Sequence, residues 1–330
     1  RALMEKAAAD PNLTYAFIES GVFPNFFGMT MPLLKYGLPV RPVQLDNVRR
    51  FPGYLDDYTA LILSYEFIKP ESPDVNNALA AWVRGGGTLV YIGDGSDPYH
   101  KIKGWWNTGK ADYLNPAEHL FEMLGLGRAP GDGVYPVGAG RTAVWNQAPA
   151  LLCTSAAIAE KYRSFIREVL AGGGQDWEYC NRLTLRRGPY LISAVMDESV
   201  NEEPAVFRGL FADMLENDYA IRTEKTVRPD ENAILFDFCK IEEEACRIVG
   251  CSARVYSLDC NDKGFRMEIK GAGSIHAWLR IRLPKPVRAI NAVDEDGNAV
   301  SMGFVWDDQT RTVLLDYDSN AKAVTVTGSF

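Results

Sequence analysis

The sequence predicts an α/β protein with an open, mostly parallel sheet and flanking helices, followed by a β-rich segment and a C-terminal antiparallel β-sandwich. Three observations predict this fold class. Residues 55–107 have the pattern of a strand, a helix, a second strand and a long polar loop. The first 100 residues alternate between strand and helix patterns, and from Cys251 onward short strands alternate with turn residues.

The stretch 55–107 carries the clearest pattern. Residues 60–65 are an apolar run without alternation, which is typical of a strand covered on both faces in a parallel sheet. Asp74 is the expected N-cap of the next helix, whose apolar residues recur at helical spacing. Glycines at 85–87 end that helix, and residues 88–92 form the next buried strand. Because such crossovers are right-handed, the two strands are expected to be parallel neighbours.

The segments on either side continue the alternation. Before the central stretch the pattern predicts a helix at 1–9, a strand at 13–19, a helix at 26–36 and a strand at 40–45. After it, Asn115 and Pro116 are expected to begin a helix, and residues 155–170 form another. The glycine-rich segment between them, residues 125–140, is predicted to be a loop with an irregular strand.

The remainder of the chain has strand patterns. Short strands are expected at 182–185, 190–196, 206–214, 219–227 and 233–238, and hairpins at 254–271, 289–302 and 304–317. This change of period predicts three parts: an α/β domain at 1–180, a β-rich continuation at 181–243 and a β-sandwich domain at 244–330. The last boundary is placed near Glu243.

Composition limits the partners and the compartment. The formal net charge of -8 argues against nucleic acid or an anionic membrane as the main partner, because both would be repelled. No apolar stretch approaches the length of a membrane span, and no signal peptide pattern is present, so a cytoplasmic location is predicted. Secretion stays open, because a chain that begins at Arg1 can be a piece of a longer polypeptide. The six cysteines lack any C-x-x-C spacing and are expected to be reduced and free of zinc.

Polar residues gather where the predicted strands end. In an open α/β sheet, ligands bind beyond the carboxyl ends of the strands. Here those ends are Ser20-Gly21, Tyr65-Glu66 and the loop that starts at Asp94. The candidate ligand-binding residues are Tyr65, Glu66, Asp94, Ser96, Asp97, Tyr99, His100, Trp105 and Trp106.

Several interpretations of this loop compete. Asp94, Asp97 and His100 are suitable ligands for a divalent cation, but their irregular spacing matches no known motif, so no metal is predicted. Trp105 and Trp106 can either stack on a sugar ring or anchor the loop, and the sequence favours anchoring. A dinucleotide motif fails because Pro98 stands at its third glycine, so no cofactor is predicted.

Nucleophilic catalysis would place its nucleophile at the sharp turn after the fourth predicted strand. That turn holds Asp94, Gly95 and Ser96, with no cysteine and no G-x-S-x-G pattern. A hydrolase that uses Ser96 or Asp94 with His100 stays open as an alternative. His119 is interpreted as a surface histidine on an acidic helix, and His276 as a packing or cross-strand residue.

Paired acidic residues are the other possible catalytic groups. The pairs at 56–57, 202–203 and 242–244 are interpreted as solvated turns or helix starts rather than as the two carboxylates of a glycosidase. The chain is therefore expected to have no catalytic residues of its own, and whether it belongs to an enzyme is left open.

Three phrases carry a resemblance to a known family. YGLPVRPVQLD, YLDDYTALILSYEFIKP and ALAAWVRGGGTLVYIGD resemble the non-catalytic domain that follows the barrel in bacterial family 42 β-galactosidases and related glycoside hydrolases. The resemblance covers residues 13–126. It implies a class I glutamine amidotransferase-like, flavodoxin-like fold with a role in trimerisation, followed by a small β-sandwich.

The resemblance sets the functional expectation. The chain would be an accessory or oligomerisation region of a multidomain glycoside hydrolase, with a loop contributed to a carbohydrate site. Its expected partners are further copies of itself, an upstream catalytic barrel, or both, because no part of this chain has the pattern of a barrel. The alternatives are a free-standing carbohydrate-binding or assembly protein and a hydrolase that uses the loop from Asp94 to His100.

Overall fold

A computed structural model describes residues 21–241 and 246–330. The chain divides into two compact units, residues 1–180 (unit 1) and 181–330 (unit 2). The helix expected at 1–9, the strand expected at 13–19 and the boundary expected near Glu243 lie outside the described residues. The division of unit 2 into separate domains at 181–243 and 244–330 stays a prediction.

Unit 1 contains a four-stranded sheet in the order β1-β2-β4-β3. Strands β1 (Ala60–Leu63), β2 (Thr88–Ile92) and β4 (Gly140–Trp145) run parallel, and β3 (Gly133–Val137) pairs antiparallel with β4 at the edge. Every residue of β2 is buried, because this strand has a neighbour on each side and helices on each face. The carboxyl end of β2 therefore lies between the carboxyl ends of its parallel neighbours β1 and β4.

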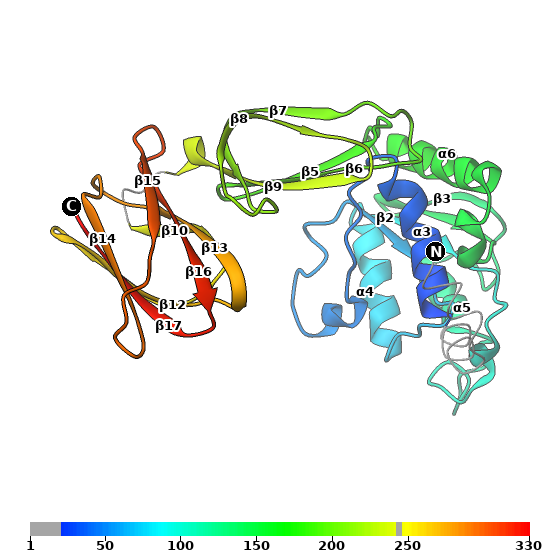
Figure 1. The fold of residues 1–330 in the computed structure, drawn as a ribbon. Coiled ribbons are helices and arrows are strands. Elements are labelled where there is room, and N and C mark those ends of the chain that lie inside the picture. The colour runs from blue at the N-terminus through cyan, green and yellow to red at the C-terminus, as the bar shows by residue number, and fades with distance from the viewer. Residues whose placement is uncertain (1–20, 242–245) are drawn as a thin grey trace, which may run out of the picture. The chain divides into compact units, whose positions relative to one another are not determined.

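Within residues 21–180, four α-helices cover the two faces of this sheet (Figure 1). Helices α4 (Pro73–Arg84) and α5 (Pro116–Leu124) pack on one face, where Leu79 and Tyr91 share a core. Helices α3 (Val22–Leu34) and α6 (Ala156–Gly172) pack on the other face, where Ile92 and Tyr162 share a second core. Short 3-10 helices lie at Leu45–Arg49 (η1), Pro98–Lys101 (η2) and Pro149–Cys153 (η3).

The helix starts show how local chemistry sets the boundaries. Asn115 caps α5, as predicted, by accepting hydrogen bonds from the backbone N–H groups of Ala117 and Glu118. The predicted cap of α4 is wrong, because Ser72 and not Asp74 has the extended backbone of an N-cap. Pro73 then occupies the first helical position, where its missing N–H costs nothing.

One other local prediction for unit 1 is wrong. Residues 40–44 form no strand, and η1 begins at Leu45. Pro39 and Pro42 lack backbone N–H groups, so an alternating side-chain pattern there cannot build a hydrogen-bonded ladder. The segment 125–140, predicted to be a loop with an irregular strand, contains β3 and the first residue of β4. Pro136 is tolerated inside β3 because that strand lies at the sheet edge.

Unit 2 begins with a five-stranded antiparallel sheet in the order β5-β6-β9-β7-β8. Its strands are β5 (Arg182–Arg187), β6 (Tyr190–Val195), β7 (Ala205–Asp213), β8 (Ile221–Val227) and β9 (Glu231–Asp237), followed by the 3-10 helix η4 (Phe238–Lys240). The five strands predicted from the sequence match these bounds within about two residues, which is the usual uncertainty of strand ends.

Two four-stranded antiparallel sheets then form a sandwich, in the orders β10-β13-β16-β15 and β11-β12-β17-β14. Inward side chains from both sheets, including Met267, Leu279, Leu315 and Val326, make its core. The strands are β10 (Arg247–Cys251), β11 (Arg254–Asn261), β12 (Gly264–Lys270), β13 (Gly273–Arg282), β14 (Ala289–Asp294), β15 (Gly303–Asp307), β16 (Thr312–Asn320) and β17 (Ala323–Ser329). The expected C-terminal sandwich agrees with this arrangement.

Two of the three predicted hairpins are confirmed, β11–β12 and β15–β16. The hairpin predicted at 289–302 is wrong, because β14 pairs with β17 and meets the returning chain at a single bridge between Val293 and Ala299. Val300 and Met302 pack against the sandwich core. The chain therefore crosses to β15 in the other sheet instead of extending a ladder along β14.

The predicted fold class is wrong for the chain as a whole, which is mostly β. Among the described residues, parallel pairing joins only β1, β2 and β4, while the other three sheets, with five, four and four strands, are antiparallel. The open parallel sheet stays small because residues 40–44 add no strand to it. A run of strand patterns after residue 181 therefore outweighs the strand–helix alternation that dominates the first 100 residues.

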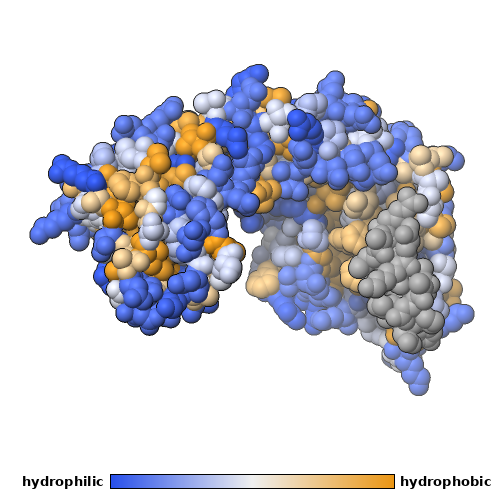
Figure 2. Space-filling view, viewed as in Figure 1, coloured by the Kyte–Doolittle hydropathy of each residue, from blue (hydrophilic) through white to orange (hydrophobic). Residues whose placement is uncertain are grey.

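The molecular surface is polar with local exceptions. Figure 2 shows hydrophobic residues gathered on the sandwich over β15, where Phe304 and Val305 are 39% and 66% exposed. Within residues 21–241 and 246–330, no helix is both long and apolar enough to span a membrane.

Candidate functional site

Glu66 joins the turns that follow β1 and β2. Its Oε1 accepts a hydrogen bond from the Gly95 N–H at 2.9 Å, and its Oε2 accepts one from the Asp97 N–H at 3.0 Å. Because β1 and β2 are parallel neighbours, their carboxyl ends lie side by side and a side chain from one can reach the backbone of the other. The Glu66 carboxylate is 3% exposed, so both bonds are shielded from water.

Asp97 makes the reciprocal connection. Its carboxylate accepts hydrogen bonds from the N–H groups of Phe67 at 2.6 Å and Tyr99 at 2.8 Å, and it forms an ion pair with Lys69. Burial alone would raise the pKa of the Asp97 carboxyl, but the hydrogen bonds from Lys69, Tyr99 and Phe67 lower this pKa below its ordinary value. Asp97 is therefore held as a carboxylate inside the protein.

His100 completes this cluster. Its Nε2 lies 3.3 Å from Glu66 Oε2, but neither ring nitrogen makes a hydrogen bond with a described residue, and the residue is 4% exposed. We call Glu66, Lys69, Asp97 and His100 the buried quartet, in which Lys69 is partly exposed and the other three residues are buried. The Lys69 ammonium group balances part of the negative charge of the two carboxylates, which reduces the cost of burying them.

The quartet includes a possible set of metal ligands. Glu66, Asp97 and His100 offer atoms within 4.8 Å of one another, and this donor set suits a transition metal. Each carboxylate oxygen already accepts a backbone hydrogen bond, however, and the Lys69 ammonium group contacts Asp97 Oδ2. A divalent cation would be repelled by that ammonium group, so these residues do not favour a metal. Asp94, the third ligand considered from the sequence, is exposed and accepts a hydrogen bond from the Ser96 N–H.

The groups considered for nucleophilic catalysis are not assembled. Asp94 and Ser96 are exposed on the turn after β2, whereas His100 is buried with its Nε2 beside Glu66. Because the ring nitrogens of His100 are bonded to no described residue, Ser96 has no histidine base. The turn thus holds a hydroxyl group without the partner that would activate it.

Both tryptophans of the loop use their indole N–H groups inside the protein. Trp106 is 4% exposed and donates to the His100 carbonyl at 3.0 Å. Trp105 is half-buried, donates to the Pro70 carbonyl at 2.9 Å and packs edge-on against His119 with ring centroids 5.2 Å apart. An indole that stacks on a sugar needs an exposed face, so this geometry is that of loop anchors.

The nine predicted ligand-binding residues separate into two groups. Tyr65, Glu66, Asp97, His100 and Trp106 are buried, and the Tyr65 hydroxyl donates to Asn76 Oδ1 at 2.5 Å. Burial raises the pKa of the Tyr65 phenol, which keeps it protonated. Asp94, Ser96 and Tyr99 are exposed, and Trp105 is intermediate. A role for any of the nine in ligand binding stays a prediction.

Two residues of this region have a different role from the one expected. Lys69 is not among the predicted candidates, although a lysine four residues after Tyr65 can fold back on the strand end, and Lys69 Nζ donates to the Tyr65 carbonyl at 2.8 Å. His119 is half-buried between Trp105 and Tyr113 rather than on the surface, with its Nδ1 3.1 Å from Asn76 Nδ2. Burial lowers the pKa of His119. The helix pattern alone could not show that the aromatic loop folds over it.

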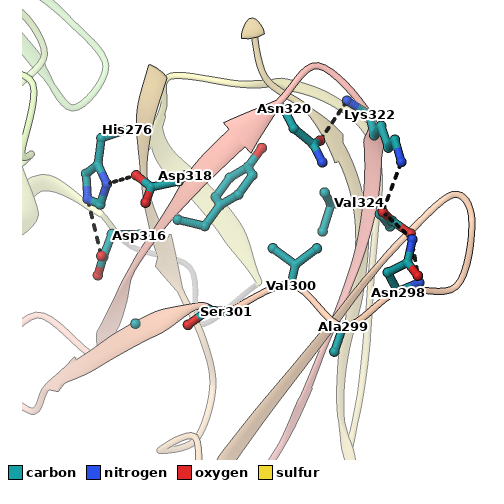
Figure 3. A pocket seen from close by; sticks show the side chains of 13 residues that line it. His276, Asn298, Ala299, Val300, Ser301, Asp316, Asp318, Asn320, Lys322 and Val324 are labelled. Carbon is teal, nitrogen blue, oxygen red and sulfur yellow. Dashed lines mark hydrogen bonds and ion pairs between the residues drawn. The ribbon is translucent and has the colours of Figure 1, made fainter. Parts of the chain in front are cut away.

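His276 has the cross-strand role expected from its place in a strand. It lies opposite Asp318 in the β13–β16 ladder, and its Nδ1 is 2.7 Å from Asp318 Oδ1 (Figure 3). Its Nε2 is 3.3 Å from Asp316 Oδ2. The hydrogen bond that the imidazole donates to Asp318 and the nearby charge of Asp316 raise the pKa of His276.

Comparison with known proteins gives only distant similarities. No family model matches the chain, and no curated protein does. A GH31 dextranase from Flavobacterium johnsoniae, complexed with glucose, is similar at 9% identity and a TM-score of 0.23, covering 65% of this chain and 37% of the dextranase. A mutant of that dextranase complexed with isomaltotriose gives the same values. The chain thus spans little more than a third of the dextranase's length.

The catalytic module of a family 98 glycoside hydrolase from Streptococcus pneumoniae TIGR4, complexed with the LewisY pentasaccharide, is also similar. Its TM-score is 0.17 at 8% identity, and the match covers 85% of this chain and 71% of that module. These structures are glycoside hydrolases, but TM-scores this low carry no argument about fold or function. Neither structure supports the expected relationship to family 42.

Proposed function

We propose that this chain is a non-catalytic accessory region of a glycoside hydrolase polypeptide, in which unit 1 contributes to assembly with further copies of the chain. The observation that carries the proposal is the buried quartet. The carboxylates of Glu66 and Asp97 stand at the carboxyl ends of β1 and β2, where a reaction would be expected, and they accept hydrogen bonds from the backbone N–H groups of the adjoining turns.

The burial of these groups supports the non-catalytic part of the proposal. A general acid or base must come within hydrogen-bonding distance of a substrate, directly or through one water molecule. Glu66, Asp97 and His100 are 3%, 2% and 4% exposed, so the backbone and not a substrate surrounds them. Asp94 and Ser96 are exposed to a substrate, but neither makes a hydrogen bond with the His100 ring.

The glycoside hydrolase context rests on the residues that resemble the family 42 accessory domain, from YGLPVRPVQLD to ALAAWVRGGGTLVYIGD. A catalytic barrel elsewhere in the polypeptide and a carbohydrate substrate for that barrel belong to the proposal. This resemblance is an analogy of sequence and fold, which suggests the kind of polypeptide but no reaction of this chain.

Apolar exposure near the quartet supports the assembly role. Ile68, Tyr99 and Ile102, which we call the loop patch, are 53%, 42% and 52% exposed. The Tyr99 and Phe67 rings pack edge-on with their centroids 5.9 Å apart. The Asp97 carboxylate accepts hydrogen bonds from the backbone N–H groups of both residues. Asp97 of the quartet holds the backbone at Phe67 and Tyr99 before any association. Association of this ordered loop would therefore cost less conformational entropy than association of a mobile loop.

A hydrolysis assay tests the non-catalytic part. The purified chain is incubated with nitrophenyl glycosides and nitrophenyl acetate, and the expected release of nitrophenol equals that of the buffer blank. Turnover that disappears in both Asp94→Ala and Ser96→Ala variants would show a working site at the turn after β2 and would overturn the proposal.

Sedimentation velocity tests the assembly part. The wild-type chain is expected to self-associate, and a Tyr99→Ser, Ile102→Ser double variant is expected to weaken association by roughly tenfold or more, because two interface anchors are lost. Leu114→Ser is the matched control, since Leu114 is 74% exposed and lies outside the loop patch. A wild-type chain that stays monomeric at about 100 μM would contradict self-assembly.

A further inference from the structure

Two of the six free cysteines lie at the same end of the sandwich. Cys246 directly precedes β10, and Cys260 is the second-to-last residue of β11. Only Ser252 and Ala253 join these two strands, which belong to different sheets of the sandwich. The chain reverses there, so positions at similar distances before and after this connection lie at one end of the sandwich. Cys246 stands six residues before Ser252, and Cys260 stands seven residues after Ala253.

Both side chains face the space between the two sheets. Cys246 packs against the sandwich core, although it lies outside the strands. Cys260 is opposite Phe265 in the β11–β12 ladder, and residues opposite each other point to the same face of a sheet. Because Phe265 is a buried core residue, Cys260 stands on the inner face of β11, where the end of the strand is exposed to solvent.

The two thiols are in direct contact. Burial and a hydrogen bond between the two thiols raise the pKa of Cys246 to about 12. Cys251, which is also in this part of the sandwich, donates its S–H to the Ala253 carbonyl at 2.9 Å instead. Cys246 therefore has Cys260 as its thiol neighbour, and the fold brings the two sulfur atoms together without a disulfide.

The pair has no third metal ligand among residues 21–241 and 246–330. In those ranges the only group of three possible ligands close enough to hold an ion is Glu66, Asp97 and His100, in unit 1. A structural zinc site takes four protein ligands, and cysteine pairs in such sites are accompanied by further cysteine or histidine residues. The contact between the two thiols therefore favours a bond between their sulfur atoms over a metal.

We propose that Cys246 and Cys260 are a redox-sensitive pair, which a small disulfide such as oxidised glutathione converts into a disulfide that locks this end of the sandwich. The Cys260 thiolate attacks one sulfur of the small disulfide and releases one small thiol. The Cys246 thiolate then attacks Cys260 Sγ and releases the second small thiol. Two protein thiols are thus oxidised to one disulfide, the small disulfide is reduced to two thiols, and the two thiol protons pass to the released thiols.

Exposure sets the order of the two steps. Cys260 is exposed and reaches the oxidant first, whereas Cys246 is half-buried and its raised pKa keeps it protonated. The bond would close a loop of 15 residues that contains β10. Such a link restricts the unfolded chain and therefore stabilises the folded sandwich. The proposal goes beyond the assembly role of unit 1, because it rests on the sandwich alone.

Peptide mapping of the whole chain tests the proposal. The protein is equilibrated with reduced or with oxidised glutathione, its remaining thiols are alkylated, and it is digested with trypsin. Trypsin leaves Cys246 on the peptide 241–247 and Cys260 on the peptide 255–263, with Cys251 on a third peptide. After oxidation the first two peptides are expected to be joined, with a mass two hydrogen atoms below their sum. In reduced glutathione they are expected to stay separate.

Serine variants assign the bond. Cys246→Ser and Cys260→Ser are each expected to abolish the joined peptides. Cys246→Ser is also expected to keep one glutathione on Cys260, because the second attacking thiolate is missing. Cys153→Ser is the matched control, since it removes an exposed cysteine of unit 1 and should leave the joined peptides unchanged. Circular dichroism of each variant shows that a lost link is not a loss of folding.

Thermal unfolding tests whether the bond locks the sandwich. The oxidised wild type is expected to melt roughly 5–10 °C above the reduced protein, and Cys260→Ser is expected to remove that difference. Three outcomes would overturn the proposal. They are peptides that stay separate in oxidised glutathione, a link that persists in Cys260→Ser, and an oxidised wild type that melts no higher than the reduced protein.

Discussion

Lys69 is the residue on which the charge balance of the quartet depends. Its side chain is 13% exposed, and that of its partner Asp97 is fully buried. The hydrogen bonds from Lys69, Tyr99 and Phe67 outweigh the effect of burial on the pKa of Asp97. Removing the lysine would leave a buried carboxylate without a counter-ion, and such a loss costs more than the net stabilisation that the pair provides.

Lys69→Met is therefore expected to destabilise unit 1 by about 2–4 kcal/mol at pH 7. In the wild type the pKa of Asp97 is lowered on folding, so its contribution is present above the ordinary carboxyl pKa and is lost as pH falls through the folded value. In the variant we expect burial to dominate and to raise the pKa of Asp97. Acidification then protonates the buried carboxylate and removes the cost of burying its charge. Urea unfolding between pH 3 and pH 7 measures the difference.

Lys101→Met serves as the control for that experiment. Lys101 is exposed on the same loop, and its replacement is expected to change the unfolding free energy by less than about 0.5 kcal/mol. Equal losses from both lysine variants would show that the Lys69–Asp97 pair contributes nothing specific.

His276 gives a second prediction at this scale. Its raised pKa means that its pairing with Asp318 and Asp316 is complete below the ordinary histidine pKa and is lost as pH rises through the folded value. An NMR titration of the imidazole protons should give a pKa above the ordinary value for His276 and below it for His119. Asp318→Asn should lower the pKa of His276, and a pKa unchanged by that replacement would contradict the assigned pairing.

Among the elements, those with a buried apolar pattern were predictable. Residues 60–65 and 88–92 were expected to be buried strands, and β1 and β2 lie there as parallel neighbours. Elements that depend on a hydrogen-bonding partner were not predictable in the same way. Residues 40–44 alternate without forming a ladder, and Val300 leaves the expected hairpin because the core of the sandwich accepts it.

The start of α4 provides a test at the scale of the element. Ser72 Oγ accepts a hydrogen bond from the Asp74 N–H, whereas Asp74 lies in the first turn. Ser72→Ala should therefore cost about 1 kcal/mol in the unfolding free energy of unit 1. Asp74→Asn should cost only a few tenths of a kcal/mol, through the helix dipole. Equilibrium unfolding of both variants checks the assignment, and a reversed order of the two losses would restore Asp74 as the cap.

Across the whole chain, the sequence was sufficient to predict where the candidate site lies but not which contacts its side chains make. Strand ends at Glu66 and Asp94 predicted where polar side chains would meet, because parallel strands end at one edge of the sheet. Which side chains turn inward depends on three-dimensional contacts such as those from Lys69 to Asp97 and from Trp106 to the His100 carbonyl.

The unfolding free energy of Glu66→Gln, set against that of Asp94→Asn, tests most directly whether the strand-end carboxylates hold the fold. An amide in place of the Glu66 carboxylate loses the charge and turns a donor toward the N–H of Gly95 or Asp97. Urea unfolding followed by tryptophan fluorescence should show a loss of about 2–4 kcal/mol for Glu66→Gln and less than about 0.5 kcal/mol for Asp94→Asn. Active-site groups commonly reduce stability, so a Glu66→Gln variant as stable as the wild type, or more stable, would contradict the account.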